Sequence, residues 1–263
     1  MDEVLTNRSF ASFFDRIYVI NLPSRPDRLE SIRQEMRQLG IADLDSKLCV
    51  PDAPICDDAG GFPTKGVRGN FLSHLGNLED AIENDFERIL VLEDDAIFRR
   101  RLWRLDYQNY VLSQVEEHDW SMWFPGHQLT THARDAAKPV YPTQTGFRWA
   151  HCYAVHRRGL RSLRDYLQLV ARRDAGHPEG GKMYIDGALS HFRKQFSDHI
   201  CLVSNPVLSI QKSTDTNLGQ MQDPLHQGTV PLLKGVARQA KDELWRRTGW
   251  RLSYPKWATP ASH

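Results

Sequence analysis

The sequence predicts an α/β protein, and two observations carry that prediction. First, apolar runs typical of strands, at residues 16–22, 47–50 and 88–92, alternate with helical patterns at residues 26–39 and 70–83. This order is typical of parallel strands joined by crossover helices. Second, the chain has 263 residues, of which 40% are hydrophobic and 25% charged, as in ordinary globular proteins. That length permits one large domain or two small ones.

Each of the two helical patterns has one apolar face, and the first has clear boundaries. A polar turn at residues 23–28 precedes the first helix, and Gly40 ends it. Its apolar residues recur at spacings of three and four: Leu29, Ile32, Met36 and Leu39. The second helix has a similar face: Phe71, Leu75, Leu78 and Ile82. Both helices are therefore expected to pack on the sheet.

The second half of the chain contains the same kinds of pattern. We expect helices at residues 107–117, 157–170 and 185–196, and strands at residues 120–124, 149–155 and 200–203. Residues 125–147 form a polar loop that suggests the rim of a site, and residues 211–227 are expected to be irregular. Trp123, on a predicted strand, is expected in the core.

The strand at residues 88–92 ends in three carboxylates, Glu93, Asp94 and Asp95. Its four consecutive apolar residues predict a strand buried on both faces. Carboxylates crowded at the end of such a strand repel one another, and a divalent cation such as Mg²⁺ or Mn²⁺ would remove that cost. Ligands of open α/β sheets bind at the carboxyl ends of the strands. The alternative is a solvated acidic loop, and the triplet alone does not separate the two.

Two further groups of polar residues are candidates for ligand contacts. Asn21, Arg25 and Arg28 follow the first strand, where a turn and a helix N-terminus can hold phosphate. Taken alone, a solvated basic helix start is the more common explanation. Ser73 and His74 lie on the second helix, where adjacent residues point apart and so need not form a nucleophile and its base. The sequence has no G-x-S-x-G, H-E-x-x-H or P-loop motif.

Charge, cysteines and termini limit the classes of function. The formal net charge of +1 gives no reason to expect a nucleic acid partner. The four cysteines stand at 49, 56, 152 and 201 without a C-x-x-C pair, so a zinc site is not expected. No apolar run approaches the ~20 residues of a membrane span. The first residues lack the basic and apolar regions of a signal peptide, so no signal peptide is expected there. A cytoplasmic location is therefore the expectation.

The last residues are basic and amphipathic. From residue 231 onward, seven Lys or Arg stand against two acidic residues. Apolar residues recur at helical spacing, and tryptophans follow: Leu233, Val236, Ala237, Ala240 and Leu244, then Trp245 and Trp250. Such a helix at residues 231–252 is typical either of a peripheral contact with an anionic membrane or of a helix packed on the domain. The sequence leaves both open.

Several motifs together resemble glycosyltransferase family 25, which includes bacterial lipooligosaccharide and collagen hydroxylysine galactosyltransferases. Residues 17–28, 69–75 and 89–95 are similar to its first three motifs, and residues 153–160 to a later strand-into-helix segment. Looser matches extend to about residue 217. The chain has Asn70 where the family usually has cysteine, and Asn77-Leu78 where the family often has tryptophan.

The resemblance implies a single GT-A-like domain with a Rossmann-type mixed sheet at residues 16–217, between a lead-in at 1–15 and a basic tail at 218–263. It implies that Glu93 and Asp95 hold Mn²⁺ or Mg²⁺ against the diphosphate of a UDP-sugar, with Asp94 toward the ribose or sugar. The nucleotide pocket would be lined by Asn21, Arg25, Arg28, Ser73 and His74.

The implied reaction is an inverting transfer of a hexose to a hydroxyl of a glycan, lipooligosaccharide or hydroxylysine-type acceptor. Galactose is the hexose that the resemblance favours. Asp186 is the candidate base, by its place in an Ile-Asp element; Asp215 and Asp198 are the next candidates. Asp186 could instead be a helix N-cap. The implied context is lipopolysaccharide biosynthesis in the cytoplasm, with a lipid-linked acceptor at the inner face of the membrane. Two other functions stay open: a non-catalytic carbohydrate- or nucleotide-binding protein, and a metal-dependent phosphohydrolase.

Overall fold

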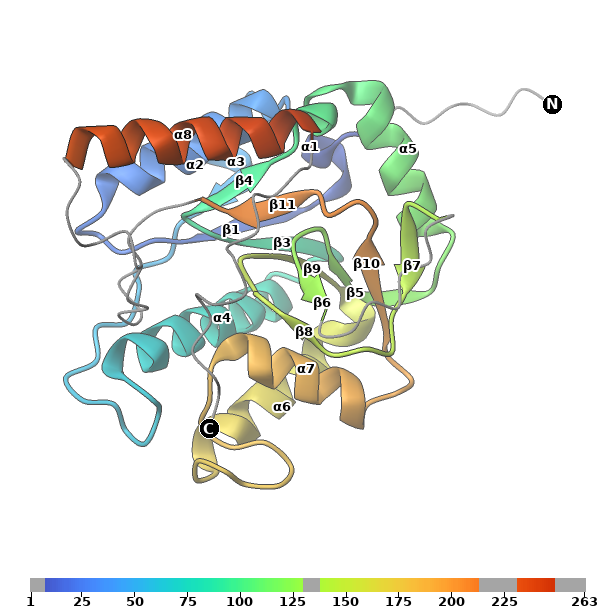
Figure 1. Ribbon diagram of the computed structural model, residues 1–263. Helices are drawn as coiled ribbons and strands as arrows, with labels where there is room; N and C mark the ends of the chain where they lie inside the picture. Colours follow the sequence, from blue (N-terminus) through green and yellow to red (C-terminus); the bar gives the residue numbers. More distant parts are fainter. Residues whose placement is uncertain (1–7, 130–137, 213–230, 249–263) are drawn as a thin grey trace.

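The computed structural model describes residues 8–129, 138–212 and 231–248, which form an α/β structure around a seven-stranded mixed sheet (Figure 1). The strand order is β2-β1-β3-β9-β5-β10-β7. These strands are β1 Arg16–Ile20, β2 Leu48–Cys49, β3 Arg88–Glu93, β5 Trp120–Phe124, β7 Val140–Pro142, β9 Cys152–His156 and β10 Ile200–Ser204. Two small sheets pair β4 Ala96–Phe98 with β11 Ser209–Gln211, and β6 Gln128–Leu129 with β8 Phe147–Arg148. The predicted α/β class with a mixed sheet is confirmed.

Strand direction brings several chain segments to one edge of the sheet. β1 runs parallel to β2 and to β3, as the sequence predicts for strands joined by helices. β9 lies antiparallel between β3 and β5. In register, Ile20 of β1 lies beside Glu93 of β3, and Leu92 lies beside Cys152 at the start of β9. The carboxyl ends of β1 and β3 therefore meet the amino end of β9.

Helices cover both faces of the sheet. In Figure 1, α4, α6 and α7 lie below the sheet, and α1, α2, α5 and α8 lie above it. The helices are α1 Phe10–Phe13, α2 Pro26–Gln38, α3 Leu44–Lys47, α4 Lys65–Glu83, η1 Arg100–Trp103, α5 Leu105–Glu116, α6 Arg157–Arg172, α7 Ile185–Gln195 and α8 Pro231–Thr248. Because side chains alternate along a strand, Ile89 and Val91 enter one core while Leu90 and Leu92 enter the other. This confirms that β3 is buried on both faces, and Trp123 is buried as expected.

The structure differs from the predicted elements in several places. Residues 125–147, predicted as a loop, contain β6, β7 and the start of β8, which are too short to show a periodic pattern. α4 begins five residues before residue 70, because the Thr64 hydroxyl accepts the Val67 amide at 3.1 Å and caps an earlier turn. β9 begins at Cys152 rather than at residue 149, because Trp149 has a φ of 71° that breaks the strand. β4 and β11 were not predicted, since three residues are too short for a periodic pattern. Residues 213–227 of the expected irregular segment lie outside the described residues.

The segments beyond the predicted domain contribute to its packing. Within residues 1–15, Phe10 and Phe14 are fully buried in the core. At the other end, α8 packs on the domain through Trp245, which lies with Ile97 and Ile210 in a small apolar cluster. The packed-helix alternative is thus confirmed for this part of α8. The cysteines at 49, 56, 152 and 201 are all free thiols.

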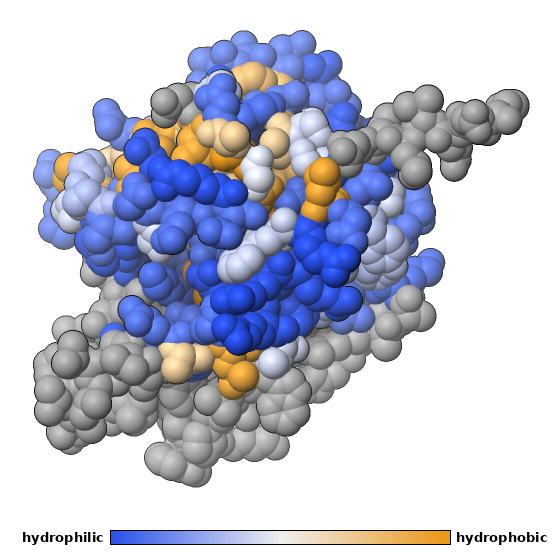
Figure 2. Space-filling model, turned by 90° about the horizontal axis from the view of Figure 1, so that it is seen from above, coloured by the Kyte–Doolittle hydropathy of each residue, from blue (hydrophilic) through white to orange (hydrophobic). Residues whose placement is uncertain are grey.

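The outer side of α8 has a different character. Leu244, a member of the predicted apolar stripe, is 39% exposed, and Ala240 is also exposed. Seen from above, the molecule is mainly hydrophilic, and hydrophobic residues appear as smaller patches between hydrophilic ones (Figure 2). Among the described residues, no helix combines the length and apolar character needed to span a membrane. Trp250 lies outside those residues.

Candidate active site

The three carboxylates lie at the end of β3, where their backbone is bonded to three distant segments. The amide of Glu93 donates to the carbonyl of His151 at 2.9 Å, and the amide of Asp94 donates to Ile20 at 3.1 Å. The Lys212 amide donates to the Asp95 carbonyl at 2.7 Å. The triplet is therefore held between the ends of β1, β9 and β11.

Both carboxylate oxygens of Glu93 accept hydrogen bonds. Asn70 of α4 donates to Oε1 at 3.1 Å, and Gln211 of β11 donates to Oε2 at 3.1 Å. His74 Nε2 lies 3.7 Å from Oε1. Burial by itself would raise the pKa of Glu93, but the His74 contact, Asn70 and the nearby His151 outweigh it and lower that pKa. Glu93 is thus held as an anion.

Asp94 is bound by two of the predicted nucleotide-pocket residues. Asn21 Nδ2 donates to Oδ2 at 2.8 Å, and Arg28 Nη1 lies 3.0 Å from Oδ1. Burial and the neighbouring Glu93 charge raise the pKa of Asp94 despite Arg28 and Asn21. The carboxylate of Asp94 therefore fixes the turn after β1 and the start of α2 against the end of β3.

Asp95 differs from the other two carboxylates in the hydrogen bonding of one side-chain oxygen. It is 7% exposed, and among the described residues its Oδ1 is buried without a hydrogen-bond partner. Burial, and then the charges of Glu93 and Asp94, raise the pKa of Asp95 to about 8. A buried carboxylate oxygen without a donor costs free energy, so this atom is suited to a ligand.

The donor set fits a divalent cation that is completed by substrate oxygens. Within the described part of the chain, no group of three or more His, Cys, Asp or Glu side chains is arranged to hold a metal on its own. Mg²⁺ sites are commonly built from one or two carboxylates plus phosphate oxygens and water. Asp95, with its unpartnered oxygen, and the adjacent Glu93 supply that number.

The other predicted binding residues lie at different distances from the triplet. Arg25 pairs with Asp27, at 2.9 and 2.8 Å, on the exposed start of α2, although its carbonyl accepts from Asn21. The Ser73 hydroxyl donates to the Gly69 carbonyl at 3.0 Å, within its own helix, and not to the triplet. His74 lies beside the triplet, near Glu93, and its Nδ1 is 2.9 Å from the Tyr153 hydroxyl. The structure therefore places Asn21, Arg28 and His74 at the triplet, but not the side chains of Arg25 and Ser73.

Asp186 lies in the first turn of α7 and contacts the chain segment that leads into β9. Its Oδ2 accepts from the Trp149 amide at 3.2 Å and its Oδ1 from the Gly187 amide at 2.8 Å. Tyr184 occupies the N-cap position, so the N-cap alternative for Asp186 is wrong. Two residues beyond Trp149, His151 bonds to Glu93. Asp198 is exposed beyond α7, and Asp215 lies outside the described residues.

Three contacts of the triplet were missed from sequence. Asn70 precedes His74 by four residues, a spacing that places both on one helix face and could have identified it. His151 reaches Glu93 through its backbone, which no side-chain pattern reports. Gln211 lies 118 residues from Glu93 on a three-residue strand, and gives no signal of its own.

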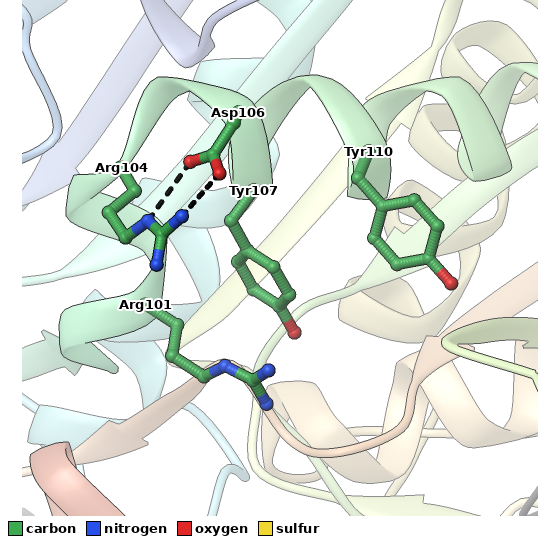
Figure 3. Close-up of a pocket in the computed structure, with 5 residues that line it drawn as sticks. All are labelled: Arg101, Arg104, Asp106, Tyr107 and Tyr110. Carbon is green, nitrogen blue, oxygen red and sulfur yellow. Dashed lines mark hydrogen bonds and ion pairs between the residues drawn. The ribbon is translucent and has the colours of Figure 1, made fainter.

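Two hollows lie on the described surface. One, of about 230 Å³, lies beside the ends of β1 and β2 and along α4. The other, of about 350 Å³, lies on η1 and α5 (Figure 3). There Arg104 pairs with Asp106, and the Arg101 guanidinium lies 5.0 Å from the Tyr107 ring centre. None of the residues that sequence predicts for the site lines this second hollow.

Comparisons with solved structures give low scores. A glycosyltransferase involved in glycosylation of the major capsid of PBCV-1 is 12% identical, with a TM-score of 0.38 over 86% of this chain and 98% of that one. The inositol-1-phosphate CTP transferase from T. maritima is 11% identical, with a TM-score of 0.34 over 74% of this chain and 86% of that one. At such scores, the description of the fold rests on the sheet and helices themselves.

Sequence comparison is more informative. A human protein named inactive glycosyltransferase 25 family member 3 is 30% identical over 173 residues, which are 57% of this chain and 28% of the relative. The chain therefore spans less than a third of that protein. The family model described as glycosyltransferase family 25 (LPS biosynthesis protein) matches residues 58–175, which include α4, the acidic triplet and β9. Together these matches agree with the resemblance carried by the motifs: residues 58–175 are similar to glycosyltransferase family 25.

Proposed function

We propose that the protein is a metal-dependent, inverting glycosyltransferase that moves a hexose from a UDP-sugar to an acceptor hydroxyl. Galactose is the first hexose to test. The observation that supports this most is the buried, unpartnered oxygen of Asp95, beside Glu93, at the carboxyl end of a parallel strand in the family 25 segment. Clefts at this edge of an α/β sheet are where ligands bind. The acceptor we propose is a glycan or lipid-linked glycan, as in lipopolysaccharide biosynthesis.

Each residue at the triplet has a separate task in this proposal. Asp95 and Glu93 hold Mn²⁺ or Mg²⁺, which when bound neutralises charge on the departing diphosphate. Arg28 adds a second positive charge near the same edge, and Asp94 keeps Arg28 and Asn21 in place. His74 and Asn70 orient the Glu93 carboxylate. Asp94 is thus better suited to positioning these side chains than to a free contact with the sugar.

We propose Asp186 as the base that accepts the proton of the acceptor hydroxyl. Its carboxylate is partly buried and accepts the Trp149 amide, two residues before His151, whose carbonyl accepts the Glu93 amide. Asp186 therefore borders the site but is not one of the proposed metal ligands. In Asp186→Asn the amide oxygen still accepts the Trp149 amide, while the basic group is lost. Turnover should therefore fall about 10²–10⁴-fold, with nucleotide-sugar binding retained. Turnover within a few-fold of wild type would transfer the assignment to Asp198 or Asp215.

One experiment tests the function as a whole. A panel of nucleotide sugars is screened by thermal shift with Mn²⁺ or Mg²⁺, since a ligand that binds only the folded state raises the melting temperature. Release of UDP is then measured with and without acceptors. Asp95→Asn should lose both responses, and Asp106→Asn, at an exposed carboxylate of α5, should keep both.

A second candidate is a non-catalytic carbohydrate- or nucleotide-binding protein. The name of the human relative calls that protein inactive, which gives a reason to test this candidate. Stabilisation by a nucleotide sugar without UDP release would support this candidate. The absence of stabilisation by every donor in the panel would contradict both functions.

We also propose that the outward side of α8 contacts an anionic membrane. The protein would then be cytoplasmic and would meet a lipid-linked acceptor at the membrane surface. Leu244→Glu, at an exposed apolar position of a basic helix, should reduce flotation with anionic vesicles. Leu105→Glu, at a similarly exposed leucine of α5, serves as the matched control. Equal flotation of the two variants and wild type would remove the idea.

A further inference from the structure

The hollow on η1 and α5 is lined by cationic and aromatic side chains and plays no part in the proposed transfer. In Figure 3, the Arg101 guanidinium and the hydroxyl ends of Tyr107 and Tyr110 point in the same direction, away from the Arg104–Asp106 pair. Its volume of about 350 Å³ lies within the roughly 300–1,000 Å³ of small-molecule sites. A ligand the size of one sugar therefore has room here.

The chain around η1 is unusually basic. Four arginines stand between residues 99 and 104, with no acidic residue among them. Arg100 pairs with a glutamate of α8, and Arg104 pairs with an aspartate of α5. Arg99 and Arg101 form no ion pair with any residue that the structure describes. Two of the four positive charges therefore have no carboxylate partner within those residues.

Arg99 is the first sign that this region receives an anion. The residue is 7% exposed, and its Nε is buried without a hydrogen-bond partner in the described part of the chain. Burial lowers the pKa of Arg99; the Tyr107 hydroxyl opposes that shift, and the Arg101 charge adds to it. A guanidinium nevertheless keeps its proton in proteins, so a charge is buried here at a cost. The Trp245 ring, 5.9 Å away, offsets only part of that cost.

Arg101 is the second sign, and it lies in the hollow itself. Its side chain is exposed, and its guanidinium lies 5.0 Å from the Tyr107 ring centre. Arg99 interacts electrostatically with both Arg101 and Tyr107, so the two guanidinium groups act on the same region. Like charges held near each other repel. An anion in contact with both would remove this repulsion and the burial cost of Arg99.

Phosphate is the anion that fits this pair best. Guanidinium groups match phosphate oxygens in geometry and bind them with two hydrogen bonds at a time. A phosphomonoester carries about −1.5 to −2 charges at pH 7, which balances two arginines. Asp106, the acidic residue of the hollow, is already bound by Arg104 and does not compete for Arg101.

The aromatic side of the hollow indicates what carries the phosphate. Tyr110 is 49% exposed, and its ring centre lies 6.3 Å from that of Tyr107. Because Arg101 lies against Tyr107, Tyr110 is the ring that remains available to a ligand. An aromatic ring of this kind suits a ligand with an apolar face and polar edges. The C–H face of a sugar ring has that character.

We propose that the hollow on η1 and α5 is a second binding site that takes a phosphorylated sugar. The phosphate contacts Arg99 and Arg101, and the sugar ring packs on Tyr110. The proposal goes beyond the transferase function and does not depend on it, because none of the proposed donor, metal or base residues lines this hollow.

The test uses glucose 6-phosphate, glucose and inorganic phosphate as probes. Each is titrated into the full chain in EDTA, so that no metal draws phosphate to the acidic triplet, and binding is measured by ligand-observed NMR. Wild type should bind glucose 6-phosphate at least tenfold more tightly than either other probe. Arg101→Gln and Arg99→Met should each weaken that binding tenfold or more, the equivalent of about 1.4 kcal/mol.

Three controls separate binding from folding and from net charge. Tyr110→Ala should weaken binding of glucose 6-phosphate severalfold and leave inorganic phosphate within twofold of wild type. Arg37→Gln removes the same charge from an exposed position of α2 and should bind normally. Arg99→Met should melt near wild type, because the buried charge is removed together with its Trp245 contact. Arg101→Gln, at an exposed side chain, tests the site even if the Arg99 variant does not fold.

The outcomes distinguish this site from the proposed transferase. UDP release by Arg101→Gln should equal that of wild type. The proposal is overturned if wild type does not bind glucose 6-phosphate, or if Arg101→Gln binds it as tightly as wild type does. Binding to vesicles that contain phosphatidic acid, without binding of glucose 6-phosphate, would assign the arginines to a lipid headgroup and would also overturn it.

Discussion

Two regions of the molecule bury a carboxylate, and they do so in opposite ways. Glu35 of α2 is 4% exposed; its Oε2 accepts the Phe98 amide at 3.1 Å, and its Oε1 pairs with Arg246 of α8. Asp95 is similarly buried, but its Oδ1 has no partner among the described residues. Burial raises the pKa of both carboxyl groups.

The difference teaches that burial alone does not identify a functional carboxylate. Glu35 fastens α8 to α2, so each oxygen is used and a ligand would find none available. At Asp95 the protein leaves an acceptor unsatisfied, at a cost that a bound cation would remove. Replacement of the two residues should therefore affect different properties.

The largest expected effect is on catalysis at Asp95. Asp95→Asn should lower transfer on the order of 10³-fold, because a metal contributes several kcal/mol and about 1.36 kcal/mol corresponds to a factor of ten. The metal-free variant should melt near wild type, since the Asn side chain has the same shape and adds no charge beside Glu93 and Asp94. Rates and melting curves on the same samples check this. Full activity in the variant, or in enzyme treated with EDTA, would contradict the metal site.

The next effect is on stability at Glu35. Glu35→Ala leaves the Arg246 guanidinium and the Phe98 amide without their acceptor. It should cost about 2–3 kcal/mol in the free energy of unfolding, less than for a fully buried pair because Arg246 is partly exposed. The rate per folded molecule should stay near wild type. Urea unfolding, followed by assays below the transition, measures both quantities. A large loss of rate in folded protein would contradict the conclusion that Glu35 affects stability alone.

A smaller effect is expected at Arg28, which connects Asp94 to the donor side. Arg28→Ala should weaken UDP-sugar binding about tenfold, because hydrogen bonds to charged groups contribute about 1.5–3 kcal/mol. Arg25→Ala provides the matched control, since Arg25 pairs with Asp27 at the surface. Calorimetric titration of both variants decides it. Similar losses in the two would show that the turn acts only through its overall charge.

The smallest effect concerns the pH dependence of stability at Glu35. Its pKa is raised above 4.5 by burial, so the folded state retains a proton that the unfolded state releases. Its contribution to stability is present below 4.5 and is lost as pH rises through the raised pKa. Glu35→Gln should flatten the stability curve over that window. Unfolding free energies at several pH values test this, and an unchanged slope would mean that other groups dominate.

The sequence was most informative where neighbouring strands are local in the chain. The parallel order of β1, β2 and β3 follows from short strand–helix repeats, and it brings Asn21 and Arg28 to Asp94. The buried character of β3 was likewise readable from four apolar residues.

Contacts between distant segments could not be predicted in the same way. Gln211 reaches Glu93 because β11 pairs with β4, and neither strand is long enough to show a period. On α8, a helix packed on the domain through its apolar stripe would bury Leu244, yet the adjacent Trp245 lies in the cluster with Ile97 and Ile210 and Leu244 is exposed. The large Trp245 ring, on the neighbouring face of the helix, is therefore the residue that packs on the domain, and the spacing of the smaller apolar residues did not indicate this face.

The backbone at Trp149 has a consequence for attempts to stabilise the protein. A non-glycine residue with a φ of 71° is strained by about 1–3 kcal/mol, and here the Asp186 carboxylate holds the amide in that conformation. Glycine would adopt the same turn without strain. Trp149→Gly would relieve that strain and remove the packing of the indole on the His151 ring, so the melting temperature of this variant measures which of the two is larger beside Asp186, the proposed base.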